Sequence, residues 1–88
     1  MKPNILFLVV DSLRADKFYG NAKTSITPNF NSLIKKGVYF SQTISSVAST
    51  SPSMGSIFTG LFPFKIGMGP ESYKKINSEI STYVDHLK

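Results

Sequence analysis

The segment Asn4–Val10 (NILFLVV) constrains the fold most, because it is almost continuously apolar and rich in β-branched residues. Continuous rather than alternating apolarity is typical of a strand buried on both faces, as in a parallel sheet covered by helices. The run ends at Asp11, which would therefore lie at the carboxyl end of a strand, where α/β sheets place ligand-binding groups. Asp11 is also a favoured residue for capping the following turn, and this simpler role stays open.

A helix and a second strand are predicted after this first strand. One helical turn fits within Leu13–Gly20, and a longer helix begins at Thr27-Pro28 and ends at Gly37. Val38–Thr43 is the second strand candidate. The order strand, helix, strand implies a parallel crossover connection. The sequence therefore predicts an α/β fold.

The stretch Ser49–Gly60 (STSPSMGSIFTG) is predicted to form a short helix that starts with hydroxyl side chains. Thr50 or Ser51 would be the N-cap, Pro52 would take the first helical position, and Gly60 would end the helix. The free N–H groups and the dipole of a helix start favour an anion, which suits an oxygen nucleophile that must meet a phosphate or sulfate. Capping alone also explains these residue types.

The parallel crossover also predicts where the two polar candidates lie. Asp11 and Thr50 each follow a predicted strand, so the topology would bring them to the same edge of the sheet. Lys65, in the Gly/Pro-rich connector 61–70, could reach an anion there or simply be solvated. A last helix is predicted over 78–88 with Asn77 as its cap, and His86 would lie on its surface.

Composition narrows the functional classes. The chain has 88 residues, of which 41% are hydrophobic and 17% charged, and this balance is typical of a globular protein. The net charge of +5 is scattered, so nucleic acid is not an expected partner, whereas an anionic substrate suits it. There is no cysteine for a disulfide or a zinc–thiolate site. No apolar run approaches the roughly 20 residues of a membrane helix, and no signal peptide is recognisable, so the chain is expected to be cytoplasmic or part of something larger.

Three ordered motifs resemble the N-terminal part of the sulfatase branch of the alkaline phosphatase superfamily. They are PNILFLVVDSLRADKFYG at Pro3–Gly20, TPNFNSLIKKGVYF at Thr27–Phe40 and TSPSMGSIFTG at Thr50–Gly60. The resemblance implies an α/β/α sandwich with a mostly parallel sheet, of which residues 1–88 would be the N-terminal portion. It implies that Asp11 binds a divalent metal, that Thr50 is the nucleophile and contacts the metal, and that the substrates are sulfate, phosphate or phosphonate esters. Ser51 and Lys65 are then candidate substrate-binding residues.

Four positions depart from the pattern of sulfatases proper. Those enzymes convert a Cys or Ser nucleophile to formylglycine, but this chain has Thr50, which cannot yield that aldehyde in the same way. Met54 and Leu61 stand where arginines are expected, and Ser12 replaces the second Asp of a common Asp-Asp pair. No formylglycine is therefore expected. The pattern resembles threonine-nucleophile relatives, which include phosphodiesterases and transferases of phosphoethanolamine or phosphoglycerol.

The resemblance predicts metal-assisted covalent catalysis through Thr50. Oxygen ligands do not choose among Ca, Mn, Mg and Zn, so the cation stays open. The family's other ligands lie far downstream, and after Thr50 this chain has only Asp85 and His86 as Asp or His. The 88 residues are therefore expected to be an N-terminal fragment, inactive alone. A non-catalytic small α/β module that binds an anion or a protein is the alternative.

Overall fold

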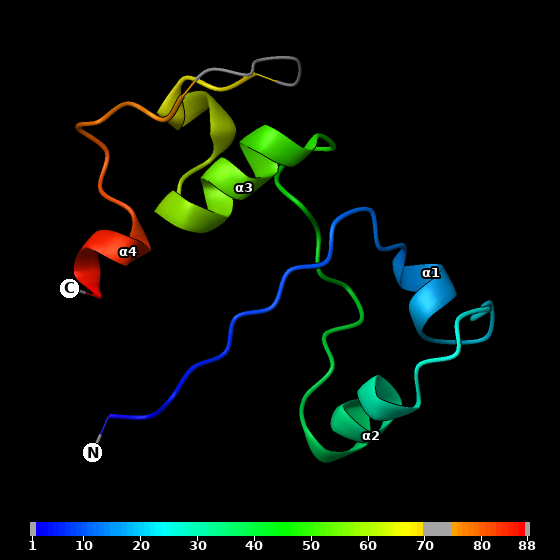
Figure 1. Ribbon diagram of the computed structural model, residues 1–88. Helices are drawn as coiled ribbons and strands as arrows, with labels where there is room; N and C mark the ends of the chain where they lie inside the picture. The colour runs from blue at the N-terminus through cyan, green and yellow to red at the C-terminus, as the bar shows by residue number, and fades with distance from the viewer. Residues whose placement is uncertain (1, 70–74, 88) are drawn as a thin grey trace. The chain divides into compact units, whose positions relative to one another are not determined.

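The computed structural model describes residues 2–69 and 75–87 (Figure 1). The described residues form four α-helices and one 3₁₀-helix, in the order α1 (Ala15–Phe18), α2 (Pro28–Lys36), α3 (Thr50–Thr59), η1 (Pro63–Ile66) and α4 (Tyr83–His86). The chain divides into two units, Met1–Ser41 and Gln42–Lys88. Among the helices that the structure describes, none has both the length and the apolar character of a membrane-spanning segment.

The two predicted strands are the main point at which the structure differs from the prediction. Residues 4–10 and 38–43 form no strand, and Figure 1 draws the first segment as a blue trace without an arrow. Their apolar side chains are exposed: Leu6 is 89% exposed and Val38 79%. A strand is stabilised by ladder hydrogen bonds and side-chain contacts with a neighbouring strand, and the described residues supply no such neighbour. The strand predictions are thus wrong for this structure, which is helical.

In the first unit, Lys23 lies in the loop between α1 and α2 and contacts residues of both helices. The ammonium of Lys23 donates to Thr27 Oγ1 at 2.7 Å and to Asn31 Oδ1 at 2.5 Å, and it lies 5.9 Å from the centroid of the Phe18 ring. Phe18 of α1 in turn meets Phe30 of α2 edge to face, with 5.5 Å between ring centroids. Both helices of this unit fall within the predicted segments, so these two predictions are confirmed.

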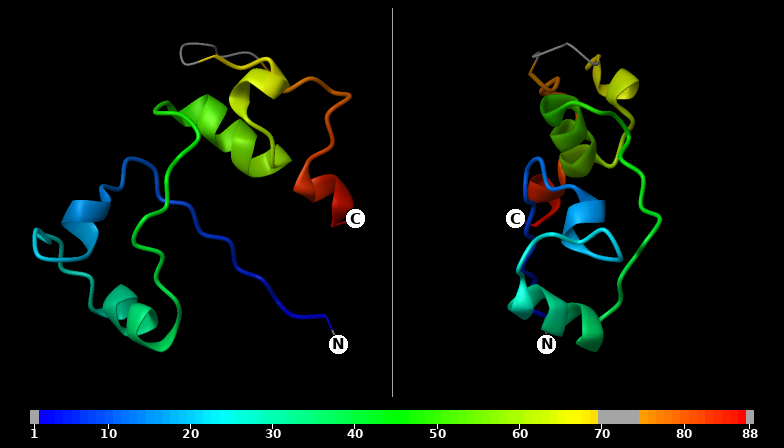
Figure 2. Two further views of the ribbon diagram at one scale, coloured as in Figure 1. Left: turned by 180° about the vertical axis from the view of Figure 1, so that it is seen from behind. Right: turned by 90° about the vertical axis from the view of Figure 1, so that its right-hand side faces the viewer.

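In the second unit, α3 packs against η1 through a glycine. Figure 2 shows η1, coloured yellow, beside α3 from two further sides. Gly55 and Pro52 are the buried residues of α3, and the buried side chains of Ile66 and Met68 lie against Gly55. A Cβ at Gly55 would lie 2.7 Å from Ile66 Cδ1 and 2.8 Å from Met68 Sδ. The glycine therefore permits the close approach of these two segments.

The predicted helix around Pro52 is confirmed, but its first residue differs. Ser49 is the N-cap and the helix starts at Thr50, so the expectation that Thr50 or Ser51 would cap it is wrong. Pro52 then takes the third helical position, which is tolerated because the first four N–H groups of a helix have no intrahelical partner. Gly60 ends the helix with φ +71°, a left-handed conformation that favours glycine.

The predicted C-terminal helix over 78–88 is shortened to α4. Asn77 does not cap it; its side chain accepts the N–H of Glu79 at 3.1 Å in a turn. Thr82 is the N-cap instead, and its N–H and hydroxyl donate to the Asp85 carboxylate at 2.8 and 2.9 Å in a capping box. Tyr83 of α4 stacks on Phe58 of α3 with 5.2 Å between ring centroids. The local cap therefore outweighs the longer apolar pattern in setting the helix start.

The capping box predicts a pH dependence of α4. The N–H of Thr82, and then its hydroxyl, lower the pKa of Asp85 below its ordinary value. A carboxyl group with a lowered folded-state pKa stabilises the structure above its unfolded pKa of about 4, and this contribution is lost as pH falls through the folded value. NMR titration should give Asp85 a pKa below 3.8 and show the α4 amides losing helical shifts only in that acidic range. A titration of Asp85 at or above the ordinary value would contradict the capping box.

Candidate functional site

Thr50 begins α3 and is exposed, and Ser51 beside it is half-buried. The extended backbone of Ser49, with φ −107° and ψ 150°, turns the chain into the helix at this point. The first turn of α3 contains no acidic residue, so no carboxylate on the helix itself offsets the positive end of the dipole. The start of α3 therefore presents a threonine hydroxyl beside backbone N–H groups that favour an anion.

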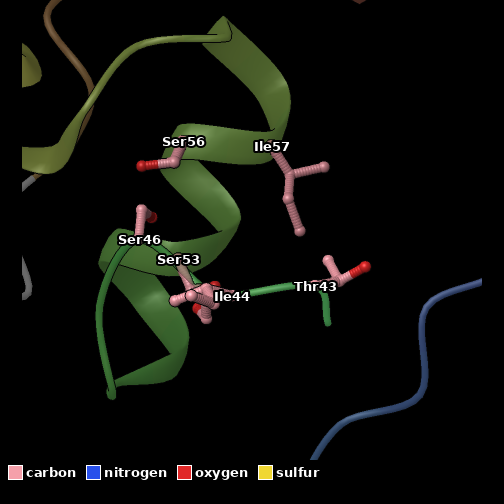
Figure 3. Close-up of a pocket in the computed structure, with 7 residues that line it drawn as sticks. Thr43, Ile44, Ser46, Ser53, Ser56 and Ile57 are labelled. Carbon is pink, nitrogen blue, oxygen red and sulfur yellow. The ribbon is translucent and has the colours of Figure 1, made fainter. Parts of the chain in front are cut away.

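A pair of serine hydroxyls fixes the loop that leads into Thr50. Ser45 Oγ donates to the carbonyl of Val47 at 2.8 Å and lies 3.3 Å from Ser53 Oγ. Ser53 itself lies one turn into α3 (Figure 3). These contacts join the loop before the helix to the helix itself, and so they help to set the position of Thr50. Serines at this spacing are not a recognised sequence signal, so the contact could not be predicted.

Asp11 follows the exposed apolar segment and is itself exposed. Its Oδ1 accepts the N–H of Ser12 at 3.0 Å. Ser12 has φ +57°, a left-handed conformation that few residues other than glycine adopt, and it stands where the resemblance expects a second aspartate. Asp11 belongs to the first unit and Thr50 to the second, so their predicted convergence stays a prediction.

A divalent cation needs more ligands than Asp11 and Thr50 alone supply. Carboxylate and hydroxyl oxygens such as those of Asp11 and Thr50 are ligands that hard cations accept, but such cations take about six in all. Within 2–69 and 75–87 no three His, Cys, Asp or Glu side chains gather to hold a metal ion. Asp11 therefore fits as one ligand of a set, and the described residues do not complete it.

Lys65 lies in η1, the 3₁₀-helix that packs beside α3. Its side chain is exposed, and the ammonium is 5.8 Å from the centroid of the Phe64 ring. Lys65 as an anion ligand stays a prediction.

An ion pair near Asp11 was not anticipated from the sequence. Arg14 Nε and Nη2 donate to the two carboxylate oxygens of Asp16 at 3.0 and 2.9 Å. The Arg14 guanidinium lowers the pKa of Asp16, and Asp16 raises the pKa of Arg14. Both side chains are exposed, and a spacing of two residues is not one of the usual side-chain pairings of a helix.

Comparison with known proteins places these features in a family. The family model described as Sulfatase matches residues 3–87. The chain is 33% identical to an ulvan-active sulfatase from Formosa agariphila and 32% identical to an N-acetylgalactosamine-6-O-sulfatase from Bacteroides thetaiotaomicron, with 99% of this chain and 18% of each relative covered. It is 35% identical to human arylsulfatase H over 76% of this chain and 12% of the relative. No solved structure was found to match.

The family model covers nearly the whole chain, including Asp11, Thr50 and Lys65. The family implies an alkaline-phosphatase-like α/β fold, of which the described residues show the helices but no strand. The chain spans 18% of the length of the first relatives, so it corresponds to a small part of such a protein. By the match over residues 3–87, this chain belongs to the sulfatase family.

Proposed function

We propose that the protein carrying this chain hydrolyses sulfate esters and that Thr50 is its nucleophile. The observation that supports this most directly is the start of α3, where Thr50 lies beside backbone N–H groups within a segment that the sulfatase family model matches. The relatives include an ulvan-active sulfatase, an arylsulfatase, an N-acetylgalactosamine-6-O-sulfatase and a choline-sulfatase, so their names support the sulfate ester class but not one alcohol.

The chemistry proposed for Thr50 is direct attack on the ester. The hydroxyl oxygen of Thr50 forms a bond to sulfur as the bond from sulfur to the alcohol oxygen breaks, and the hydroxyl proton is transferred to the departing alcohol or to solvent. The N–H groups of the first turn of α3 stabilise negative charge on the remaining sulfate oxygens. Attack by water on sulfur then releases sulfate and restores the Thr50 hydroxyl.

The proposed role of Asp11 is to supply one oxygen ligand to a divalent cation. Such a cation, when bound, would lower the pKa of a nearby hydroxyl and make it a better nucleophile. The further ligands are proposed to come from outside the described residues, because those residues gather no set of three. No formylglycine is included, since Thr50 replaces the Cys or Ser from which that group forms.

Transfer or hydrolysis of a phosphate ester is the second candidate. Two residues favour the phosphate ester candidate: Thr50 replaces the formylglycine precursor, and Met54 replaces the expected arginine. Sulfate and phosphate esters present similar tetrahedral groups to a helix start, so the site on α3 suits both. The two candidates share Thr50 as the nucleophile and differ in the group transferred.

Turnover of 4-nitrophenyl sulfate and 4-nitrophenyl phosphate by the whole protein should separate the two candidates. We expect faster turnover of the sulfate ester and, after rapid acid quench, a sulfo group on the peptide containing Thr50 by mass spectrometry. A phospho group on that peptide, with faster turnover of the phosphate ester, would favour the second candidate. If divalent cations are present and neither ester is turned over and Thr50 is not modified, both candidates are contradicted.

A further inference from the structure

The loop 43–49 that leads into α3 contains no helix or strand, so its course depends on side-chain contacts. Its first part, 43–46, lies beside α3, since both segments line one open pocket (Figure 3). Within this loop the hydroxyl of Ser45 donates to the carbonyl of Val47 at 2.8 Å. Such a local bond from a side chain to the backbone ties the loop back on itself shortly before the N-cap residue Ser49.

Ser53 of α3 is held through both its backbone and its side chain. Its N–H donates to the carbonyl of Ser49 at 3.2 Å, and this bond closes the first turn of the helix around Thr50. Its Oγ lies 3.3 Å from Ser45 Oγ. Because Ser45 gives its only hydroxyl hydrogen to Val47, Ser53 is the donor in this contact. Thr50 therefore lies in a turn that Ser53 closes, and Ser45 joins that turn to the loop.

We propose that Ser45 and Ser53 are positioning residues for the nucleophile. Their contact holds the first turn of α3 against the loop and so fixes where the Thr50 hydroxyl meets the ester. Thr50 precedes Ser53 by three residues, so the two residues are neighbours on one face of the helix. Neither serine is assigned a contact with the reacting atoms. This inference rests on the proposed function, since it needs Thr50 to be the nucleophile.

Removing the Ser45 hydroxyl should slow the chemical step and leave substrate binding unchanged. In the whole protein, Ser45→Ala should lower kcat about 10-fold and keep KM within about 2-fold, for whichever 4-nitrophenyl ester is turned over. The physical reason is that a nucleophile displaced by about 1 Å can lose about 100-fold in rate, and loss of one contact shifts it less. Ser45→Thr keeps the hydroxyl group and should restore most of kcat. An unchanged kcat in Ser45→Ala would overturn the inference.

Ser25→Ala is the matched control for lost stability. Ser25 Oγ donates to the carbonyl of Lys17 at 2.8 Å, the same length as the bond from Ser45 to Val47, and both bonds are exposed. Ser25 lies between α1 and α2. Its substitution should lower the melting temperature about as much as Ser45→Ala does and leave kcat and KM unchanged. An equal loss of kcat in both variants would mean that stability, and not position, slows the enzyme, which would overturn the inference.

A second variant shows whether the two serines act through one contact. Ser53→Ala should also lower kcat, but it should have no further effect in the Ser45→Ala background, because both changes remove the same contact. If the two effects on kcat instead multiply in the double variant, the serines act independently and the inference is overturned.

Hydrogen exchange separates failure of this inference from failure of the proposed function, because it needs no turnover. The Ser53 amide should exchange faster in Ser45→Ala than in the unchanged protein. The Asn31 amide makes the equivalent bond in α2, donating to the carbonyl of Thr27 at 2.9 Å, and its exchange should not change. Unchanged exchange at Ser53 would overturn the inference even in an active enzyme. Absence of turnover of either ester by the unchanged protein would contradict the proposed function, while exchange at Ser53 still reports whether the serine contact holds the turn.

Discussion

Replacing Thr50 by alanine should abolish ester hydrolysis by the whole protein, with a loss in kcat of about 10⁴-fold or more. The reason is that alanine removes the oxygen that forms the covalent bond, whereas the rest of the helix start is unchanged. The fold should be retained, because Thr50 is exposed and alanine is the best helix former. Steady-state kinetics with 4-nitrophenyl sulfate, together with far-UV circular dichroism, would measure both effects.

A matched substitution controls for the loss of a threonine hydroxyl as such. Thr24 is exposed in the loop between α1 and α2, and only its backbone N–H is used, donating to the carbonyl of Lys17 at 3.2 Å. Thr24→Ala should therefore leave kcat unchanged. Thr50→Ser keeps a hydroxyl group and should retain part of the activity. If Thr50→Ala keeps activity within about 10-fold of the unchanged protein, Thr50 is not the nucleophile, because loss of a nucleophile costs far more.

The helices show what local sequence signals can predict. The Thr27-Pro28 start and Gly37 after the last turn set the bounds of α2, and Gly60 sets the end of α3, because caps and breakers act within a few residues. The start of α3 was predicted less well. Proline fits any position of the first turn, so Pro52 could not show by itself that Ser49, and not the predicted Thr50 or Ser51, is the cap.

The strands and the site show what local signals cannot predict. The apolar run 4–10 indicates burial, but a strand also needs a neighbour, and none lies among the described residues. The contacts of Lys23 with Thr27 and Asn31 depend on how the loop folds, and so does the contact between Ser45 and Ser53. The choice of Asp11 and Thr50 as candidates came from their places in the sequence motifs, and their meeting at one site stays a prediction.

The largest effect on stability is expected at Gly55, where α3 and η1 come closest. Gly55→Leu should lower the free energy of unfolding by about 2 kcal/mol, because overpacking a filled interior commonly costs about 1–3 kcal/mol and the gain in helix propensity offsets part of it. The added side chain would have to displace Ile66 and Met68, whose exposed fractions are only 3% and 6%. Urea unfolding of the protein, monitored by a spectroscopic signal from residues of the second unit, would measure the change.

A double-mutant cycle would show that the clash with Ile66 is the cause. Gly55→Ala adds one methyl group 2.7 Å from Ile66 Cδ1, and Ile66→Val removes that Cδ1 atom. If the contact is what limits position 55, the double variant should be more stable than the sum of the single effects by about 0.5 kcal/mol or more, since contacting residues couple. Ile57 lies on the same helix but is not among the nearest neighbours of a Cβ at Gly55. The effect of Ile57→Ala on stability should therefore be additive with that of Gly55→Ala. Additivity of the Gly55 and Ile66 changes would mean that α3 and η1 can move apart freely, and the close packing would not be what holds this unit together.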